Sequence, residues 1–332
     1  MNRNKILQSG VLRRIFVCIA LVFFVTGCQK QQVLEVSKLT ISRDTTWAGN
    51  ILIAGDVYVE PGVTLTIAPG TIVKFKRIDE TSDQNMFDID SPYYPQAELI
   101  IRGKLIAKGT EKEKIIFTSA EIDARPADWG AVNFLGSDGN IIEYCKFLFA
   151  YNGVHAHGSS LQISHSEFVK NGVGVSFKSE EETQGVEWFG KRSNVQVTSS
   201  LFARNKGGIG FRNSDAVITG NEISDNKFFG IFPKEDVKAE ISKNEITGNK
   251  KGVYLYQARG VIFRNNNIYD NVDYNITVAE AQDYDIDARN NWFGTINREK
   301  IQEMIFDKND DPELGKVEID PFLDRQVEWE QN

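Results

Sequence analysis

Residues 195–278 contain one pattern four times, and this repetition decides the fold. The copies read VQVTSSLFARNKGGIGF from Val195, AVITGNEISDNKFFGIF from Ala216, AEISKNEITGNKKGVYL from Ala239 and VIFRNNNIYDNVDYNITV from Val261. One position is always Ser or Asn, and its occurrences lie 21, 23 and 22 residues apart, at Ser200, Asn221, Asn244 and Asn266. A fixed period in the low twenties indicates a solenoid, in which neighbouring units stack to bury a common core.

The spacing inside each copy indicates the type of solenoid. Apolar residues alternate two apart without a helical face, and the leucine-rich spacing is absent, which favours short strands joined by tight bends. We therefore predict an all-β protein, a right-handed parallel β-helix with turns of about 21–25 residues whose strands pair at ~4.8 Å.

Stacking of like residues on like predicts interior columns. One column is apolar and comprises Phe147, Phe168, Phe202, Ile223, Ile246 and Ile268. A second consists of asparagines, at 171, 205, 226, 249 and 271. Asparagine tolerates the left-handed conformation that a sharp bend needs, and stacked amides can hydrogen-bond along the ladder. We interpret the asparagine column as turn chemistry.

The first 27 residues have the pattern of an export signal. Basic residues precede an apolar run from Ile15 to Val25, which is too short to span a bilayer as a mature helix. The run closes with VTGC at residues 25–28, which resembles the bacterial lipobox. The resemblance implies that residues 1–27 are removed and that Cys28 is lipidated and anchors the protein to a membrane. An ordinary cleaved signal peptide is the alternative.

By resemblance to the enterobacterial sorting rule, Gln29 favours the outer membrane of the cell envelope. Whether the protein faces the periplasm or the outside of the cell is left open.

The predicted mature chain is acidic. Removing the four cations of the signal from the total of 38 leaves 34 cations against 46 acidic residues, a net charge of −12. This charge, without a basic recognition segment, argues against nucleic acid as a partner. Cys145 remains alone once Cys18 leaves with the signal and Cys28 carries lipid, so no intramolecular disulfide forms. We predict a monomer.

Stretches outside the four copies resemble a known superfamily. They are NILIAGDVYVEPGVTLTIAPGTIVKFKR from Asn50, ELIIRGKLIAKGTEKEKIIFTS from Glu98 and NNWFG from Asn290. They are similar to bacterial and archaeal surface proteins of the pectin-lyase-like β-helix superfamily, over roughly residues 46–325. The resemblance implies the fold, and it implies that a site, where the superfamily has one, lies on the strand after the bend that here carries the asparagine column.

These observations divide the chain. The predicted parts are a signal peptide at 1–27, the lipidated Cys and a tether at 28–45, N-terminal β-helix turns at 46–135, regular repeats at 136–294, a C-terminal cap at 295–325 and a tail at 326–332. The cap rests on NREKIQEMIF at 297–306, whose Ile301, Met304 and Ile305 share one helical face. Such a cap would cover the open end of the strand stack.

Alternation along the strand after the asparagine bend predicts which side chains point outward. We take eight of them as candidate ligand-binding residues: His155, His157, Lys178, Arg212, Phe232, Lys234, Tyr254 and Tyr256. Cations and aromatic rings on one face suit an acidic polysaccharide, because rings stack on sugars while Lys and Arg meet carboxylates or sulfates. The alternative is an ordinary solubilising edge.

No catalytic residue is predicted, because this outward column offers no Asp or Glu for glycosidase chemistry. We therefore favour a binding or structural surface. The second reading is a polysaccharide lyase or hydrolase, in which Arg and Lys activate a uronate. His155 and His157 could bind a transition metal or act as a base, which gives a third reading, an accessory factor for metal-site maturation. A surface histidine pair without carboxylate support is the competing interpretation.

Two interruptions complete the sequence. Residues 77–97 carry acidic side chains that could hold Ca²⁺, although a solvated loop is favoured: Asp79, Glu80, Asp83, Asp88 and Asp90. Residues 178–194 lengthen one turn and contain Trp188 and Phe189, which we expect to pack back onto the stack rather than meet a ligand.

Overall fold

The computed structural model describes residues 33–87, 94–279 and 281–329. The predicted signal peptide, Cys28, Asp88 and Asp90 lie outside these residues. Within the described part of the chain, no helix has both the length and the apolar character that crossing a membrane requires.

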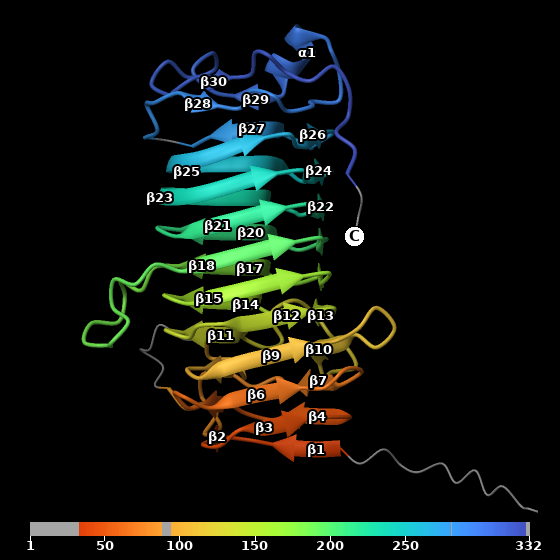
Figure 1. Ribbon diagram of the computed structural model, residues 1–332, viewed down its shortest axis with the longest axis vertical. Coiled ribbons are helices and arrows are strands. Elements are labelled where there is room, and N and C mark those ends of the chain that lie inside the picture. Colours follow the sequence, from red (N-terminus) through yellow and green to blue (C-terminus); the bar gives the residue numbers. More distant parts are fainter. Residues whose placement is uncertain (1–32, 88–93, 280, 330–332) are drawn as a thin grey trace, which may run out of the picture. The chain divides into compact units, whose positions relative to one another are not determined.

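Short strands stack in three rows along the chain, and Figure 1 shows them in sequence order from β1 at one end to α1 at the other. The first row forms one sheet: β1 (Val33–Val36), β4 (Asn50–Ile53), β7 (Ile72–Phe75), β10 (Ile115–Ser119), β13 (Cys145–Leu148), β16 (Glu167–Val169), β19 (Leu201–Ala203), β22 (Glu222–Ser224), β24 (Glu245–Thr247) and β26 (Asn267–Tyr269).

The other two rows join into a second sheet. One comprises β2 (Leu39–Ile41), β5 (Val57–Val59), β8 (Leu99–Ile101), β11 (Val132–Leu135), β14 (Asn152–His157), β17 (Val173–Lys178), β20 (Gly207–Arg212), β23 (Phe229–Ser242), β25 (Lys251–Arg264), β27 (Tyr274–Val278) and β29 (Ile305–Phe306). The other comprises β3 (Thr45–Trp47), β6 (Thr64–Ile67), β9 (Lys104–Lys108), β12 (Asn140–Glu143), β15 (Ser160–Ser164), β18 (Asn194–Thr198) and β21 (Asp215–Thr219), and β23 and β25 continue it.

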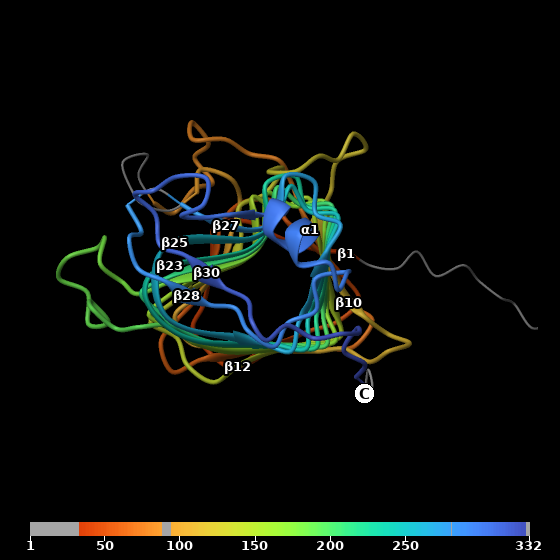
Figure 2. The same cartoon turned by 90° about the horizontal axis from the view of Figure 1, so that it is seen from above.

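Parallel pairing between successive turns confirms the predicted fold class. Strand β16 pairs in parallel with β13 on one side and with β19 on the other. Figure 2, which looks along the stack, shows the rows wound around a common core. The fold is all-β apart from α1 (Arg298–Glu303), which is the only helix in the described residues.

The predicted apolar column is confirmed. Phe147, Phe168 and Phe202 face one another in register, and their rings stack at centroid distances of 4.8 Å with interplanar angles of 5° and 3°. The column continues through Ile223 and beyond, and its members are fully buried. Flat rings one strand spacing apart pack face to face in the interior, and this packing stabilises the stack.

The predicted asparagine column also forms, as a ladder of buried amides. Asn205 Nδ2 donates to Asn226 Oδ1 at 3.0 Å, and Asn226 Nδ2 donates to Asn249 Oδ1 at 2.8 Å. A second ladder runs through the position that marks the repeat, with Asn221 Nδ2 donating to Asn244 Oδ1 at 2.9 Å. Each amide thereby satisfies polar groups that the bend would otherwise leave buried and unpaired.

The conformational reason given for the asparagine column was wrong. The left-handed residue is the one before each asparagine: Arg204 has φ 59° and Asp225 has φ 56°. That residue reverses the chain, and the asparagine that follows keeps a right-handed or extended backbone so that its amide points inward to the ladder. The bend and the ladder therefore use two neighbouring residues.

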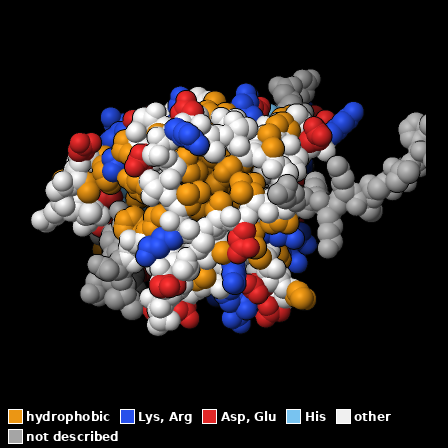
Figure 3. All heavy atoms as spheres, turned by 90° about the horizontal axis from the view of Figure 1, so that it is seen from below, with side chains coloured by type: hydrophobic (Ala, Val, Ile, Leu, Met, Phe, Trp, Pro, Cys, Tyr) orange, Lys and Arg blue, Asp and Glu red, His pale blue; other side chains and the backbone are white. Residues whose placement is uncertain are grey.

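The solenoid begins earlier than predicted. Strand β1 pairs with β4, with Val33 opposite Asn50, so the predicted tether at 28–45 already contains solenoid strands. The sequence pattern missed β1 because the strand covers the open end, where Val33 and Leu34 remain 55% and 48% exposed instead of alternating. Figure 3, which views this end, shows apolar side chains gathered at its centre.

At the other end, the helical cap is shorter than predicted. The helix α1 ends at Glu303, and Ile305 belongs to β29, which pairs with β27. Ile301 and Ile305 are both buried. The described part of the predicted tail, residues 326–329, runs back along the stack, where Val327 N donates to Asn267 Oδ1 at 2.8 Å.

Candidate functional site

The predicted outward row lies on one sheet face. His157, Lys178, Arg212, Lys234 and Tyr256 are opposite one another on successive strands from β14 to β25. A parallel row through His155, Ser176, Gly210 and Phe232 runs beside it. Because Ser176 has a small side chain and Gly210 has none, the face is hollowed between the larger residues on either side.

A groove of about 380 Å³ follows this hollow. Five of the eight predicted ligand-binding residues line it: His155, Lys178, Arg212, Phe232 and Lys234. The other three lie beside or behind it. The Tyr254 ring stacks on Phe232 at 4.5 Å, Tyr256 is opposite Lys234 on the next strand, and His157 is buried behind His155.

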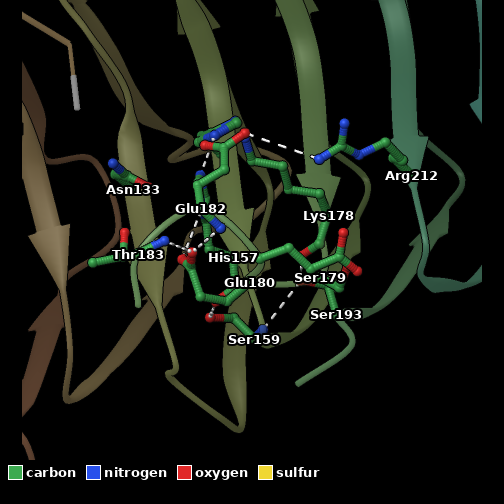
Figure 4. A network of polar contacts seen from close by, with 12 residues as sticks. Asn133, His157, Ser159, Lys178, Ser179, Glu180, Glu182, Thr183, Ser193 and Arg212 are labelled. Atoms are coloured by element: carbon green, nitrogen blue, oxygen red, sulfur yellow. Dashed lines mark hydrogen bonds and ion pairs between the residues drawn. The ribbon is translucent and has the colours of Figure 1, made fainter. Parts of the chain in front are cut away.

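The two histidines are buried, so the interpretation as a surface pair without carboxylate support is wrong. His155 is 8% and His157 is 2% exposed. His157 Nδ1 lies 3.0 Å from Glu180 Oε2, and Glu180 is itself buried. The prediction failed because Glu180 comes from the insertion after β17, which folds back over β14 (Figure 4).

A directional chain of hydrogen bonds connects these groups. Asn152 Nδ2 donates to His155 Nδ1 at 3.2 Å, and His155 Nε2 lies 2.6 Å from His157 Nε2. Because an ionised Glu180 accepts from His157 Nδ1, the neutral tautomers are set: His155 carries its proton on Nε2 and donates it to His157 Nε2. The Glu180 carboxylate thus orients both rings.

The electrostatics favour a neutral His155 beside an ionised Glu180. Burial, followed by the charges of His157 and Lys178, holds the pKa of His155 well below its usual 6.5. Burial opposes ionisation of Glu180, but the hydrogen bonds from His157 and from the backbone of Thr183 and Glu182 outweigh it and lower its pKa to about 2. His155 is therefore a free base at neutral pH.

Tyr94 packs beside His155 and Asn152. Its hydroxyl bonds to Asn152 Nδ2, and its ring meets the edge of His155 at a centroid distance of 5.5 Å. Burial, followed by the charge of Glu98, raises the pKa of Tyr94. The Tyr94 hydroxyl therefore stays protonated, whereas the neighbouring His155 is a free base.

The insertion also supplies an acid to the groove itself. Glu182 Oε1 accepts from Lys178 Nζ at 2.5 Å and lies 3.9 Å from Arg212 Nη2. Figure 4 shows the Glu182 carboxylate next to Lys178 and joined by a dashed line to Arg212, with Glu180 and His157 below it. The prediction that the outward face has no Asp or Glu holds for the strands and fails for the insertion.

Sequence reasoning missed Tyr94, Asn152, Glu180 and Glu182. The signal available for two of them was the run Glu180-Glu181-Glu182, which follows Lys178 at the point where one turn is lengthened. The direction in which an insertion folds is not encoded in strand alternation, and Tyr94 reaches the site from a loop 58 residues before its partner Asn152.

The two aromatic residues of the insertion have different environments. Trp188 packs back as expected: its ring lies against Gly136, and the Arg102 guanidinium lies 3.6 Å from the ring centroid. Phe189 remains 49% exposed. Packing of Trp188 fixes the base of the loop that delivers Glu180 and Glu182 to the groove.

No metal arrangement emerges in the described residues. They contain no group of three or more His, Cys, Asp or Glu side chains placed to hold an ion. The Nε2 atoms of His155 and His157 are 2.6 Å apart, whereas two nitrogens that share one metal at ~2.0–2.1 Å each lie farther apart. In the acidic loop at residues 77–97, for which a solvated loop was favoured over a Ca²⁺ site, Asp79 accepts from Thr81 Oγ1 at 2.7 Å.

Comparison with known proteins agrees with this architecture. A family model described as a right-handed beta helix region matches residues 184–302. A search of the curated proteins found no match. A solved structure of a variant of the periplasmic alginate epimerase AlgG is similar at a TM-score of 0.50 and 15% identity, covering 90% of this chain and 78% of that one.

The A-module of the Azotobacter vinelandii mannuronan C-5 epimerase AlgE6 has a TM-score of 0.35 and 9% identity, covering 90% of each chain. Identities this low bear on the fold alone. The parallel ladders, the matched region and the likeness to AlgG together show that this chain has the right-handed parallel β-helix fold.

Proposed function

We propose that the groove binds a polysaccharide of uronic acids and that His155 removes the proton from the carbon next to the sugar carboxylate. One observation carries the proposal. The buried chain from His155 through His157 to Glu180 opens onto a groove whose other wall is the row Lys178, Arg212 and Lys234. A base and a cluster of cations are what abstraction of a proton beside a carboxylate requires.

The cations supply the binding and the activation. Lys and Arg beside a carboxylate stabilise the negative charge that develops when the neighbouring carbon loses its proton. Burial and the charge of Arg212 hold the pKa of Lys234 below its usual value, so another anion in the groove is favourable. Phe232, with the Tyr254 ring stacked on it, offers an apolar face for a sugar ring.

The hydrogen-bonded chain from His155 to Glu180 accepts the proton that is removed from the sugar. His155 Nδ1 takes it from carbon after the Asn152 amide yields its place, and the C–H electron pair remains on the carbon as an enolate. The imidazolium is stabilised because its Nε2 proton can shift to His157, whose Nδ1 proton is held by Glu180. Tyr94 is protonated and its ring contacts His155, and we assign to it the donation of a proton to the leaving oxygen or back to carbon. These two outcomes are elimination and epimerisation.

The fold comparison fits this class of substrate, because AlgG is named as an epimerase of alginate, an acidic polysaccharide. The proposal itself rests on the groove. Binding without turnover is the second candidate, and one observation favours it: both ring nitrogens of His155 are engaged within the protein, by Asn152 and by His157.

The groove is tested by removing its cations and one ring. The triple change Arg212→Ala, Lys234→Ala, Tyr256→Ala is expected to abolish binding to uronic-acid oligosaccharides without unfolding the protein, because none of the three is part of the buried core. Wild-type binding, measured by calorimetry, is expected to weaken with added salt, because partly exposed charges are screened. Unchanged binding by the folded triple variant would place the site elsewhere, and no wild-type binding would leave a structural or protein-partner role.

We further propose that the protein is held in the cell envelope by lipid on Cys28. The change Cys28→Ala is expected to abolish acylation and to release the protein from the membrane fraction, because stable anchoring depends on the acyl chains. Metabolic labelling with a palmitate analogue measures the first effect and fractionation the second. Labelling that persists in this variant would contradict the lipid anchor.

A further inference from the structure

The Glu182 carboxylate lies in the cationic groove, beside Lys178 and Arg212. Its Oε1 is bonded to Lys178 Nζ at 2.5 Å and lies 3.9 Å from Arg212 Nη2, so one oxygen faces both cations. The residue belongs to the insertion and not to a strand of the sheet. A carboxylate is therefore already seated where the groove concentrates positive charge.

The contact with Glu182 does not satisfy the hydrogen-bond donors of the Arg212 guanidinium. Its ion pairs, to Glu182 and to Glu235, are both 3.9 Å long. Its Nε is buried and has no hydrogen-bond partner among the described residues. A guanidinium presents a planar fork of donors that fits the two oxygens of one carboxylate. Glu182 therefore marks the place of a carboxylate without forming the bidentate contact that Arg212 can make.

The Glu182 side chain can leave without unfolding the loop. The loop backbone is held by Glu180 Oε1, which accepts from Glu182 N at 2.9 Å and from Thr183 N at 2.7 Å. The Glu182 side chain is 38% exposed, and ion pairs at this exposure contribute little. Only side-chain torsions need to change for the carboxylate to swing into solvent.

We propose that Lys178 and Arg212 form a carboxylate subsite, that Glu182 occupies it in the ligand-free protein, and that the carboxylate of a sugar residue displaces Glu182 on binding. The inference rests on the proposed function and adds where the sugar carboxylate is bound. Glu182 acts as a competitor built into the chain.

The subsite also positions the sugar for the proposed chemistry. Lys178 is opposite His157 on β14, and Ser176, two residues earlier on β17, is opposite His155. The two rows are two residues apart along each strand, a distance of ~6.6 Å, so a carboxylate held by Lys178 and Arg212 lies beside the row of His155. The carbon attached to that carboxylate is then directed toward the imidazole.

The test compares Glu182→Gln with Glu181→Gln. Both remove one negative charge from the same loop, but Glu181 bonds to Ser179 and Asn213 and not to the subsite. The probes are oligogalacturonate and oligomannuronate of defined length, titrated by calorimetry at low salt, and the same oligomers with their carboxylates reduced to alcohols. For the acidic oligomers, Glu182→Gln is expected to lower Kd about fivefold relative to wild type, the size of effect that loss of one partly exposed ion pair allows.

The other outcomes separate the two proposals. Glu181→Gln is expected to leave Kd near the wild-type value, and the reduced oligomers are expected to gain nothing from Glu182→Gln. If Glu182→Gln binds the acidic oligomers as wild type does, or more weakly, the displacement is wrong and the groove remains. An equal gain in Glu181→Gln would show a general charge effect and would also overturn it. If neither wild type nor Glu182→Gln binds any acidic oligomer, the proposed function and this inference both fail.

Discussion

Replacing Phe202 with alanine is expected to lower the free energy of unfolding by about 3–5 kcal/mol. Phe202 is fully buried, and its ring stacks on Phe168 at 4.8 Å in parallel orientation. Its other neighbour in the column is Ile223, in register on the next turn. Truncation leaves a cavity between two turns that cannot collapse, because the strand spacing is held by backbone hydrogen bonds above and below.

The measurement is a urea melt followed by circular dichroism. The matched control is Phe189→Ala, which removes the same side chain from a position that is 49% exposed and is expected to change stability little. Equal losses in the two variants would mean that the interior column does not carry the stability we assign to it. A larger loss in Phe189→Ala would mean that Phe189 contributes more to the packed interior than Phe202 does.

The second large effect concerns turnover. If the protein acts on uronic-acid polymers as proposed, His155→Ala is expected to reduce the turnover rate by roughly 10²–10⁴, the usual contribution of a general base. Binding of the polymer is expected to persist, because Lys178 and Arg212 remain. Ultraviolet absorbance of the unsaturated sugar measures elimination, and a change in uronate composition followed by NMR measures epimerisation.

The control is His165→Ala, which removes a histidine that lines a different groove and stacks on Tyr144. It is expected to keep full turnover. The rate should also fall in acid, because a protonated His155 cannot accept a proton, with a midpoint below the ordinary 6.5 since burial lowers its pKa. Full turnover in His155→Ala would remove this residue from the chemistry, and wild-type binding without turnover would favour the second candidate function.

Strand alternation predicted the regular repeats correctly but not the end of the solenoid. Alternation within the repeats placed Phe168, Phe202 and Ile223 in one column, because each strand has a period of two and each turn repeats the same register. The same rule placed Lys178, Arg212 and Lys234 on one face. It could not identify β1 as a strand, since an end strand has neighbours on only one side and its burial pattern is lost.

By itself, the sequence determined the solenoid, its interior columns and the row of outward cations, because all three follow from periodicity, which is local and repeated. The tertiary structure alone decided that His155 and His157 are buried, that Glu180 orients them and that Glu182 lies between Lys178 and Arg212. These contacts come from the two segments that interrupt the repeat, residues 77–97 and 178–194. An insertion has no register to inherit, so its path is set by packing such as that of Trp188 against Gly136, which no local pattern encodes.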